Sequence, residues 1–239
     1  MSAQGRAAAL VPAAGRGERL GPGTPKALRT IGGAPMLVHA IHALAASRCL
    51  QLIVVAAPAD QVEEVRSLLS QVDSGTDIWV VSGGDTRQES VARALIALPE
   101  DVDVVLVHDA ARPLVPPEVV SAVVATVRKG SPAVVPAIGL ADTVKCVDEA
   151  EVVTRTLDRA QLRAIQTPQG FRRSVLQTAH AAVEPGHQPA TDDAGLVEQG
   201  GVPIQVIPGH EEAFKVTRPI DLLLAEAILA RRRTASGRG

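Results

Sequence analysis

Short runs of apolar residues alternate with longer segments of helical periodicity along most of the chain. The apolar runs are continuous, as expected for strands whose two faces are both covered. Strands are expected at residues 7–14, 52–57, 77–81, 102–107 and 133–137, and helices at about 60–69, 86–98 and 117–129. This alternation indicates a doubly wound α/β sheet, which binds its ligands at the carboxyl ends of the strands.

The alternation stops at about residues 139–165. Residues 143–147 and 152–157 resemble two short strands joined by the polar turn Asp148-Glu-Ala-Glu, so they predict a β-hairpin. An isolated hairpin is marginally stable in water. We therefore expect it to project as an arm that packs against something else, most simply a second subunit.

The chain ends in a predicted helix over Pro219–Arg231 that begins with proline near its first turn. The arginines at 231–233 suit the negative end of that helix, and we interpret them as a helix terminus and solvated tail rather than a nucleic-acid patch. These boundaries predict a single domain over residues 1–233, with the arm included, and a disordered tail over 234–239.

Composition narrows the possible functions. Of the 239 residues 46% are hydrophobic but only 1% aromatic, so the core must consist of Ala, Val, Leu and Ile, and base stacking on aromatic side chains is disfavoured. A net charge of −2 argues against a DNA-binding surface. The two cysteines form no C-x-x-C pair, which fits a reducing cytoplasm. The apolar start at residues 7–14 is too short to span a membrane.

The loop after the first predicted strand carries the strongest chemical signal. It holds glycines at 15, 17, 21 and 23 and the cations Arg16, Arg19 and Lys26. Glycines let the backbone approach a bulky anion, and the cations can stabilise a polyphosphate. Neither a Walker A loop nor a G-x-G-x-x-G fingerprint is present. A flexible Gly/Pro loop is the alternative, but the spacing of the cations favours a triphosphate site.

Other candidate residues follow predicted strands on the same edge of the sheet. Asp109 comes after the strand at 102–107, where a carboxylate suits Mg²⁺ held partly by phosphate oxygens; the alternative is a turn-forming aspartate. Arg112 could bind a substrate phosphate or hold the loop. The segment Ser82–Ser90 could approach a base or sugar, or simply cap a helix.

Two further segments have open interpretations. Lys215 is expected on a short strand before the last helix. Thr191-Asp-Asp-Ala could be a helix cap with a carboxylate in the first turn, or a substrate contact. No Ser–His–Asp order and no zinc-like histidine spacing occurs, so covalent catalysis is not required. The pattern favours positioning and charge neutralisation around phosphates, which is how nucleotidyl transfer usually proceeds.

A series of motifs together resembles a known family. They are Pro-Ala-Ala-Gly-x-Gly-x-Arg-Leu-Gly-x-x-x-Pro-Lys, Gly-Gly-x-x-Arg-x-x-Ser-Val, Val-His-Asp-Ala-Ala-Arg-Pro, Asp-Thr-Val-Lys, Thr-x-Asp-Arg, Gln-Thr-Pro-Gln-x-Phe, Thr-Asp-Asp-Ala and Lys-Val-Thr-Arg-Pro. In this order, over about residues 10–227, they resemble the 2-C-methyl-D-erythritol 4-phosphate cytidylyltransferases of the non-mevalonate isoprenoid pathway. The first motif alone would indicate only a nucleotidyltransferase.

The resemblance implies a Rossmann-like, mostly parallel sheet of the nucleotide-diphospho-sugar transferase type and a Mg²⁺-dependent, cytoplasmic homodimer joined through the β-arm. It implies transfer of CMP from CTP to methylerythritol phosphate, with release of pyrophosphate. Arg19, Lys26 and Lys215 would be catalytic, and Asp109 would bind the metal. Arg112, Thr143, Arg159 and Thr191 would bind the acceptor, Arg159 reaching it from the partner subunit. The implied CTP-binding residues are Pro12, Ala13, Ala14, Gly15, Gly17, Gly83, Gly84, Asp85, Ser90 and Ala110.

Two rival functions remain open from the sequence. A ribitol-5-phosphate cytidylyltransferase would share most of the CTP site, so the acceptor-side residues Thr143, Arg159 and Thr191 are the discriminators. A non-catalytic nucleotide-sensing module is the other rival. The presence of both Arg19 and Lys26 argues against it, because binding of CTP alone would not need both at the α-phosphate.

Overall fold

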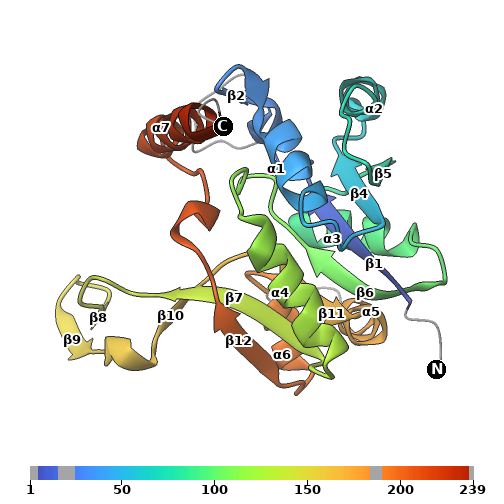
Figure 1. The fold of residues 1–239 in the computed structure, drawn as a ribbon. Coiled ribbons are helices and arrows are strands. Elements are labelled where there is room, and N and C mark those ends of the chain that lie inside the picture. Colours follow the sequence, from blue (N-terminus) through green and yellow to red (C-terminus); the bar gives the residue numbers. More distant parts are fainter. Residues whose placement is uncertain (1–4, 16–24, 184–189, 237–239) are drawn as a thin grey trace.

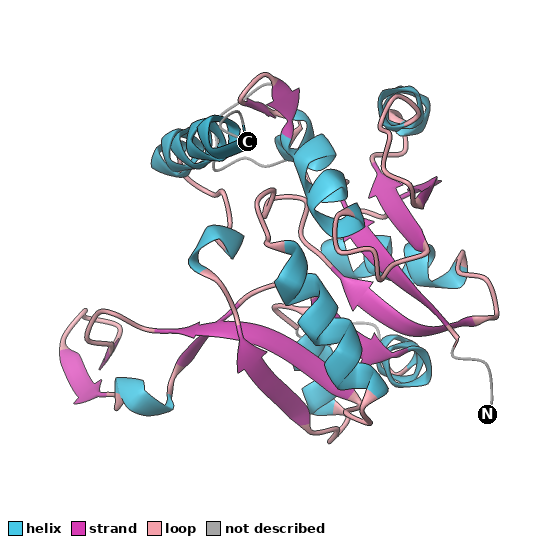
Figure 2. Ribbon diagram, viewed as in Figure 1, coloured by secondary structure: helices cyan, strands magenta, loops and turns pink. Residues whose placement is uncertain are grey.

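The computed structural model describes residues 5–15, 25–183 and 190–236, and its centre is an eight-stranded sheet (Figures 1 and 2). From one edge the sheet runs through β5 (Asp77–Ser82), β4 (Leu52–Ala57), β1 (Arg6–Pro12), β6 (Val102–Val107), β11 (Gln169–Arg172) and β7 (Ala133–Gly139), with β10 (Arg163–Ile165) and β12 (Ile204–Pro208) also paired to β7. The first four strands are mutually parallel, as are β7 and β12.

The prediction of a mostly parallel, doubly wound sheet is therefore confirmed, with one addition that the sequence pattern did not give. Strand β11 lies between β6 and β7 and is antiparallel to both, and β10 is antiparallel to β7. All six residues of β4 are buried, which explains why its sequence is an unbroken apolar run.

Helices cover both faces of the sheet. On one face, α1 (Met36–Ala45), α2 (Val62–Leu69) and α4 (Pro117–Arg128) pack on strand residues such as Ala7 and Ala9. On the other face, α3 (Arg87–Ile96), α5 (Arg173–Ala181) and α6 (Asp193–Gln199) pack on residues such as Ala8 and Leu10. Because successive residues of a strand point to opposite faces, each strand contributes to two separate cores.

The predicted hairpin is present as a small separate sheet. Strands β8 (Lys145–Val147) and β9 (Val153–Thr156) pair antiparallel and are shorter than the sequence suggested. Figure 1 shows this arm extending away from the main sheet beyond β7 and β10. All four residues of β9 are exposed. The 3-10 helix Arg159–Gln161 leads back from the arm to β10.

The C-terminal helix differs from its prediction. Helix α7 spans Pro219–Ser236, so residues 234–236, which we expected in a disordered tail, belong to the helix. Residues 237–239 lie outside the described ranges. It packs on β2 (Thr30–Ile31), the partner strand of β3 (Ala34–Pro35), through a third apolar cluster that includes Ile31 and Ala225. Within the described ranges, no helix combines the length and apolar character needed to cross a membrane.

Residues 231–233 lie near the C-terminal end of α7, and the Arg231 side chain is 70% exposed, as expected for a solvated helix terminus. They also make contacts that the sequence did not predict. Arg231 and Arg232 both pair with Glu212, and Arg232 Nη2 donates to the Leu114 carbonyl at 2.9 Å. Arg233 donates to the carbonyl of Gly32 in the turn between β2 and β3. These arginines fasten the end of α7 to three loops.

Residue 170 tests how tightly α4 covers the sheet. A Cβ added to Gly170 on β11 would lie 2.3 Å from Val123 Cγ1 and 3.2 Å from Val127 Cγ2. We expect Gly170→Ala to lower the free energy of unfolding by about 2 kcal/mol, the usual cost of overpacking. Urea denaturation measures this. Gly139→Ala is the matched control, because a Cβ there meets nothing within 4 Å. Equal stability of the two variants would contradict this packing.

Candidate active site

A cavity of about 240 Å³ opens at the carboxyl ends of β1 and β6. Strands β4 and β6 flank β1 on opposite sides, so the strand order reverses here, and such a switch point is where doubly wound sheets bind ligands. The cavity is lined by Pro12, Ala13, Ala14, Gly15, Lys26, Ala27, Gly84, Asp85, Thr86, Arg87, Ser90, Asp109, Ala110, Ala111 and Lys215.

The loop after β1 forms one wall of this cavity. The Ala13 amide donates to the Ala56 carbonyl at 2.8 Å, which continues the β1–β4 ladder one residue beyond the strand. The chain then passes Gly15 and re-enters the described part at residue 25, where Lys26 begins the 3-10 helix Lys26–Leu28. Arg16, Gly17 and Arg19 lie outside the described residues.

A tight turn between β5 and α3 forms the second wall. The Gly83 amide donates to Ala57 O at 2.7 Å. Ser90 Oγ accepts from the Gly84 amide at 3.1 Å and donates to Thr86 O at 2.9 Å. A Cβ on Gly83 would lie only 2.8 Å from Ala14 Cβ, so glycine lets the two walls meet.

The alternative of a helix cap applies to part of this turn. Thr86 is the N-cap of α3 and forms a capping box with Glu89. Asp85 does not cap the helix and lines the cavity instead, next to Gly84 and Ser90. Cap and cavity wall are therefore built from neighbouring residues of one motif.

Asp109 is the electrostatic centre of the cavity floor. Its carboxylate lies 2.8 Å from Lys215 Nζ, 3.2 Å from Arg87 Nε and 3.8 Å from Arg112 Nε, and the side chain is 11% exposed. Burial alone would raise the pKa of Asp109, but Arg87, Lys215 and Arg112 outweigh burial and hold this pKa well below its usual range. Asp109 is therefore ionised at any physiological pH.

Buried polar groups fix the backbone on either side of Asp109. The Asp109 amide donates to Thr167 Oγ1 at 3.1 Å, and that hydroxyl lies 3.1 Å from His108 Nδ1. His108 Nε2 lies 3.1 Å from Arg112 O. Because a carbonyl can only accept, Nε2 carries the proton and Nδ1 accepts from the threonine hydroxyl. Burial lowers the pKa of His108 to about 4, so the ring is neutral.

The two roles considered for Arg112, and the short strand expected around Lys215, can now be compared with the observed contacts. Arg112 donates to Ala213 O at 2.7 Å and to Ile165 O at 3.3 Å, so it holds these two loops together. The prediction of a short strand around Lys215 is wrong, because the segment that follows the 3-10 helix Glu211–Ala213 is irregular. The Val216 amide nevertheless donates to Ala111 O at 2.8 Å, which directs Lys215 to the cavity.

The predicted acceptor residues do not gather in this cavity. Thr143 lies near the base of the arm, and Arg159 begins the 3-10 helix beyond it and donates to Ala141 O. Thr191 precedes α6, where Asp192 accepts from the Gly195 amide at 2.8 Å and is the N-cap. None of the three lines the cavity within a single chain.

Sequence reasoning missed Arg87 and Asp193. Arg87 was one letter of the motif Gly-Gly-x-x-Arg and received no role, yet it lines the cavity and contacts two carboxylates. Asp193 is buried, and Arg87 Nη1 lies 2.6 Å from its Oδ2. The only sequence signal for Asp193 was the pair of aspartates after Thr191, and it did not show which aspartate caps the helix and which forms the buried ion pair.

The donor set around Asp109 also bears on metal binding. Among the described residues, no group of three or more His, Cys, Asp or Glu side chains is placed to hold a metal ion. Hard cations such as Mg²⁺ are commonly bound by one or two carboxylates together with substrate phosphates and water. Asp109 on the floor of this cavity fits that arrangement.

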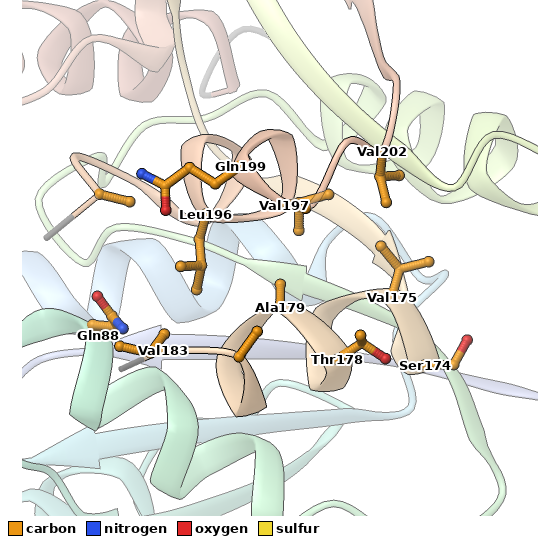
Figure 3. Close-up of a pocket in the computed structure, with 13 residues that line it drawn as sticks. Gln88, Ser174, Val175, Thr178, Ala179, Val183, Leu196, Val197, Gln199 and Val202 are labelled. Atoms are coloured by element: carbon orange, nitrogen blue, oxygen red, sulfur yellow. The ribbon is translucent and has the colours of Figure 1, made fainter. Parts of the chain in front are cut away.

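A larger cavity of about 440 Å³ lies between α5 and α6, where Figure 3 shows Val175, Leu196 and Val197 facing the space. None of the lining residues that the structure describes is charged. Such a lining cannot neutralise a polyphosphate, so size alone does not identify the active site.

The smaller cavity has the properties of a nucleotide site. The cavity is lined by three cations, Lys26, Arg87 and Lys215. Two carboxylates, Asp85 and Asp109, line it with them beside glycine-rich backbone, at a switch point of an α/β sheet. This combination defines a nucleotidyltransferase-like α/β protein. A family model for 2-C-methyl-D-erythritol 4-phosphate cytidylyltransferase matches residues 7–231, and the chain belongs to this family.

Individual relatives agree with the family assignment. The cytidylyltransferase of that name from Streptomyces coelicolor is 59% identical over 240 residues, which cover 97% of this chain and 88% of the relative. The one from Frankia casuarinae is 60% identical over 226 residues, covering 95% and 82%.

Solved structures give the same picture. The 4-diphosphocytidyl-2C-methyl-D-erythritol synthase of Anaerococcus prevotii superposes with a TM-score of 0.83 at 26% identity, covering 95% of this chain and 100% of that one. The Thermus thermophilus cytidylyltransferase superposes at 0.75 with 36% identity, covering 93% and 98%.

His108 predicts a pH dependence of stability. Its folded pKa of about 4 lies below the ordinary value of 6.5, so the unfolded chain binds more protons between these values. The free energy of unfolding must then fall as pH falls, by about 2 kcal/mol between pH 7.5 and pH 5 from this residue alone. Urea denaturation at both pH values measures the change. His108→Gln should lack this component, and equal pH dependence of the two proteins would contradict it.

Proposed function

We propose that this protein transfers CMP from CTP to 2-C-methyl-D-erythritol 4-phosphate, giving 4-diphosphocytidyl-2-C-methyl-D-erythritol and pyrophosphate in isoprenoid precursor biosynthesis. Family membership over residues 7–231 supports the reaction. The observation in this chain that supports the reaction is the pairing of the Asp109 carboxylate with Lys215 and Arg87. These three residues line one cavity together with glycine-rich backbone and Lys26.

The chemistry follows from the charges around this cavity. A phosphate oxygen of the acceptor attacks the α-phosphorus of CTP and forms the new P–O bond. The bond from that phosphorus to the bridging oxygen breaks, and pyrophosphate leaves with the electron pair. Lys26 and Arg19 stabilise the additional negative charge of the transition state. Positioned cations contribute in this way without forming a covalent intermediate.

The nucleoside end of CTP would lie against the turn between β5 and α3. Gly84, Asp85 and Ser90 line that side, and the close approach of Gly83 to Ala14 leaves backbone groups facing the cavity. The proposed CTP-binding residues Pro12, Ala13, Gly15 and Ala110 line the same cavity.

A divalent cation completes the proposed site. Asp109 would hold it together with oxygens of the triphosphate, and the cation supplies charge neutralisation to the departing pyrophosphate. Asp109 now pairs with Lys215 at 2.8 Å, so cation and lysine would share one carboxylate. The described residues offer no complete ligand set, which supports entry of the metal with the nucleotide.

We further propose that two chains associate through the arm and that Arg159 reaches the acceptor in the partner's cavity. The arm exposes the apolar side chains of Val147, Val152 and Val153, an arrangement that favours burial against another surface. Arg112, Thr143 and Thr191 would bind the acceptor in the same assembled site. The free cysteines Cys49 and Cys146 support a cytoplasmic location.

An assay of pyrophosphate release tests the reaction. Protein with CTP, Mg²⁺ and methylerythritol phosphate should release pyrophosphate, and Lys26→Ala should lower kcat by about 100- to 1000-fold because a transition-state cation is lost. Lys129→Ala, an exposed lysine at the end of α4, is the control and should retain full activity. Release only with ribitol 5-phosphate would reject the acceptor proposed here, and CTP binding without release would identify a sensor.

Mixed dimers test the role of Arg159. Lys26→Ala and Arg159→Ala should each be inactive alone. When the two are unfolded together and refolded, half of the dimers carry both subunits, and each of these regains one intact site if Arg159 acts across the interface. Activity should then recover to roughly a quarter of the wild-type value for a two-fold dimer. No recovery, while sedimentation shows mixed dimers, would place Arg159 in its own chain's site.

A further inference from the structure

A buried carboxylate lies behind the cavity and takes no part in the chemistry proposed above. Asp193 is the first residue of α6 and is 2% exposed. Its Oδ2 lies 2.6 Å from Arg87 Nη1, and its Oδ1 lies 3.1 Å from His180 Nε2 on α5. Burial alone would raise the pKa of Asp193, but the bonds to His180 and Arg87 outweigh it and lower this pKa.

Arg87 connects this interior group to the cavity. Its Nε lies 3.2 Å from Asp109 Oδ1, so one guanidinium bridges two carboxylates that come from the end of β6 and the start of α6. Arg87 itself lines the cavity. The planar fork of arginine holds its donors in fixed, separate directions toward the two partners, whereas the single ammonium of lysine does not.

We propose that Asp193 is a positioning residue for nucleotidyl transfer, acting through Arg87 on Asp109 and on the cavity wall. Asp193 binds one edge of the Arg87 guanidinium. Asp109 therefore accepts only the Nε contact from Arg87, and its oxygens remain able to accept bonds from other partners. Without Asp193, the Arg87 guanidinium would either pair with Asp109 alone or move away from the cavity wall. This inference rests on the proposed role of Asp109 in CTP binding.

His180 provides the second support of Asp193. An ionised carboxylate only accepts hydrogen bonds, so the 3.1 Å contact requires His180 Nε2 to donate. Because the two oxygens of Asp193 are held by different helices, the carboxylate plane is fixed, and that plane sets the direction of Arg87. The chain of contacts therefore runs from His180 through Asp193 and Arg87 to Asp109.

Calorimetric titration of CTP in the presence of Mg²⁺ and without acceptor tests the proposal. D193N should weaken CTP binding by about tenfold, the usual effect of losing a hydrogen bond to a charged group. D192N is the matched control on the adjacent residue: asparagine caps a helix as well as aspartate does, so binding should stay within about twofold. Wild-type affinity in a folded D193N would overturn the proposal, whereas absence of CTP binding in the wild type would instead overturn the proposed function.

A double-mutant cycle separates positioning from general loosening of the fold. R87K keeps the charge and loses the fork, so it should weaken CTP binding about as much as D193N. The double variant should be no worse than R87K alone, because both changes break one chain of contacts. Multiplying losses would overturn the proposal.

Variants of His180 test the same proposal if D193N does not fold. H180L preserves bulk but cannot donate, and it should weaken CTP binding about threefold, since one of two supports is lost. H180Q can donate an amide N–H to Asp193 and should restore the affinity. Unchanged binding in H180L, or equal losses in H180L and H180Q, would overturn the role assigned to this chain of contacts.

Discussion

The ion pairs of Asp109 hold the working parts of this structure together. The three cations around that carboxylate come from three places: Arg87 from the start of α3, Arg112 from the loop after β6, and Lys215 from the irregular segment before α7. Two of them also hold a neighbour: Arg87 pairs with Asp193, and Arg112 donates to the carbonyls of Ala213 and Ile165. A carboxylate buried at a sheet edge must be paired, so its charge draws these distant segments to one point.

That balance of charge leaves room for an anion. Among the described residues in or beside the cavity, four cations (Lys26, Arg87, Arg112 and Lys215) meet three carboxylates (Asp85, Asp109 and Asp193), which leaves one positive charge in excess. In the proposed function, the triphosphate of CTP would supply the missing negative charge, and the backbone of the β1 loop and the β5–α3 turn would offer it neutral donors. Recognition and fold stability therefore depend on the same electrostatic arrangement.

The sequence predicted those parts of the fold whose structure is determined locally. The strands at 52–57 and 102–107 were predicted with their observed bounds, because both faces of each strand are covered and all their residues except Asp103 are apolar. The short antiparallel strand β11, with the sequence Gln-Gly-Phe-Arg, has no such pattern and exists because β6 and β7 flank it. Likewise Arg87 meets Asp193 across 106 positions, a pairing that no local pattern encodes.

Lys215 shows how a cation that we propose to be catalytic can be placed without regular secondary structure. On one side, the Val216 amide is bonded to Ala111 O on the cavity floor. On the other side, Glu212 is held by Arg231 and Arg232 of α7, and Arg232 also bonds the Leu114 carbonyl. The segment is thus anchored at both ends, from inside the cavity and from the C-terminal helix. The arginine-rich end of α7, which lies outside the cavity, is therefore part of what positions the lysine over the proposed phosphate site.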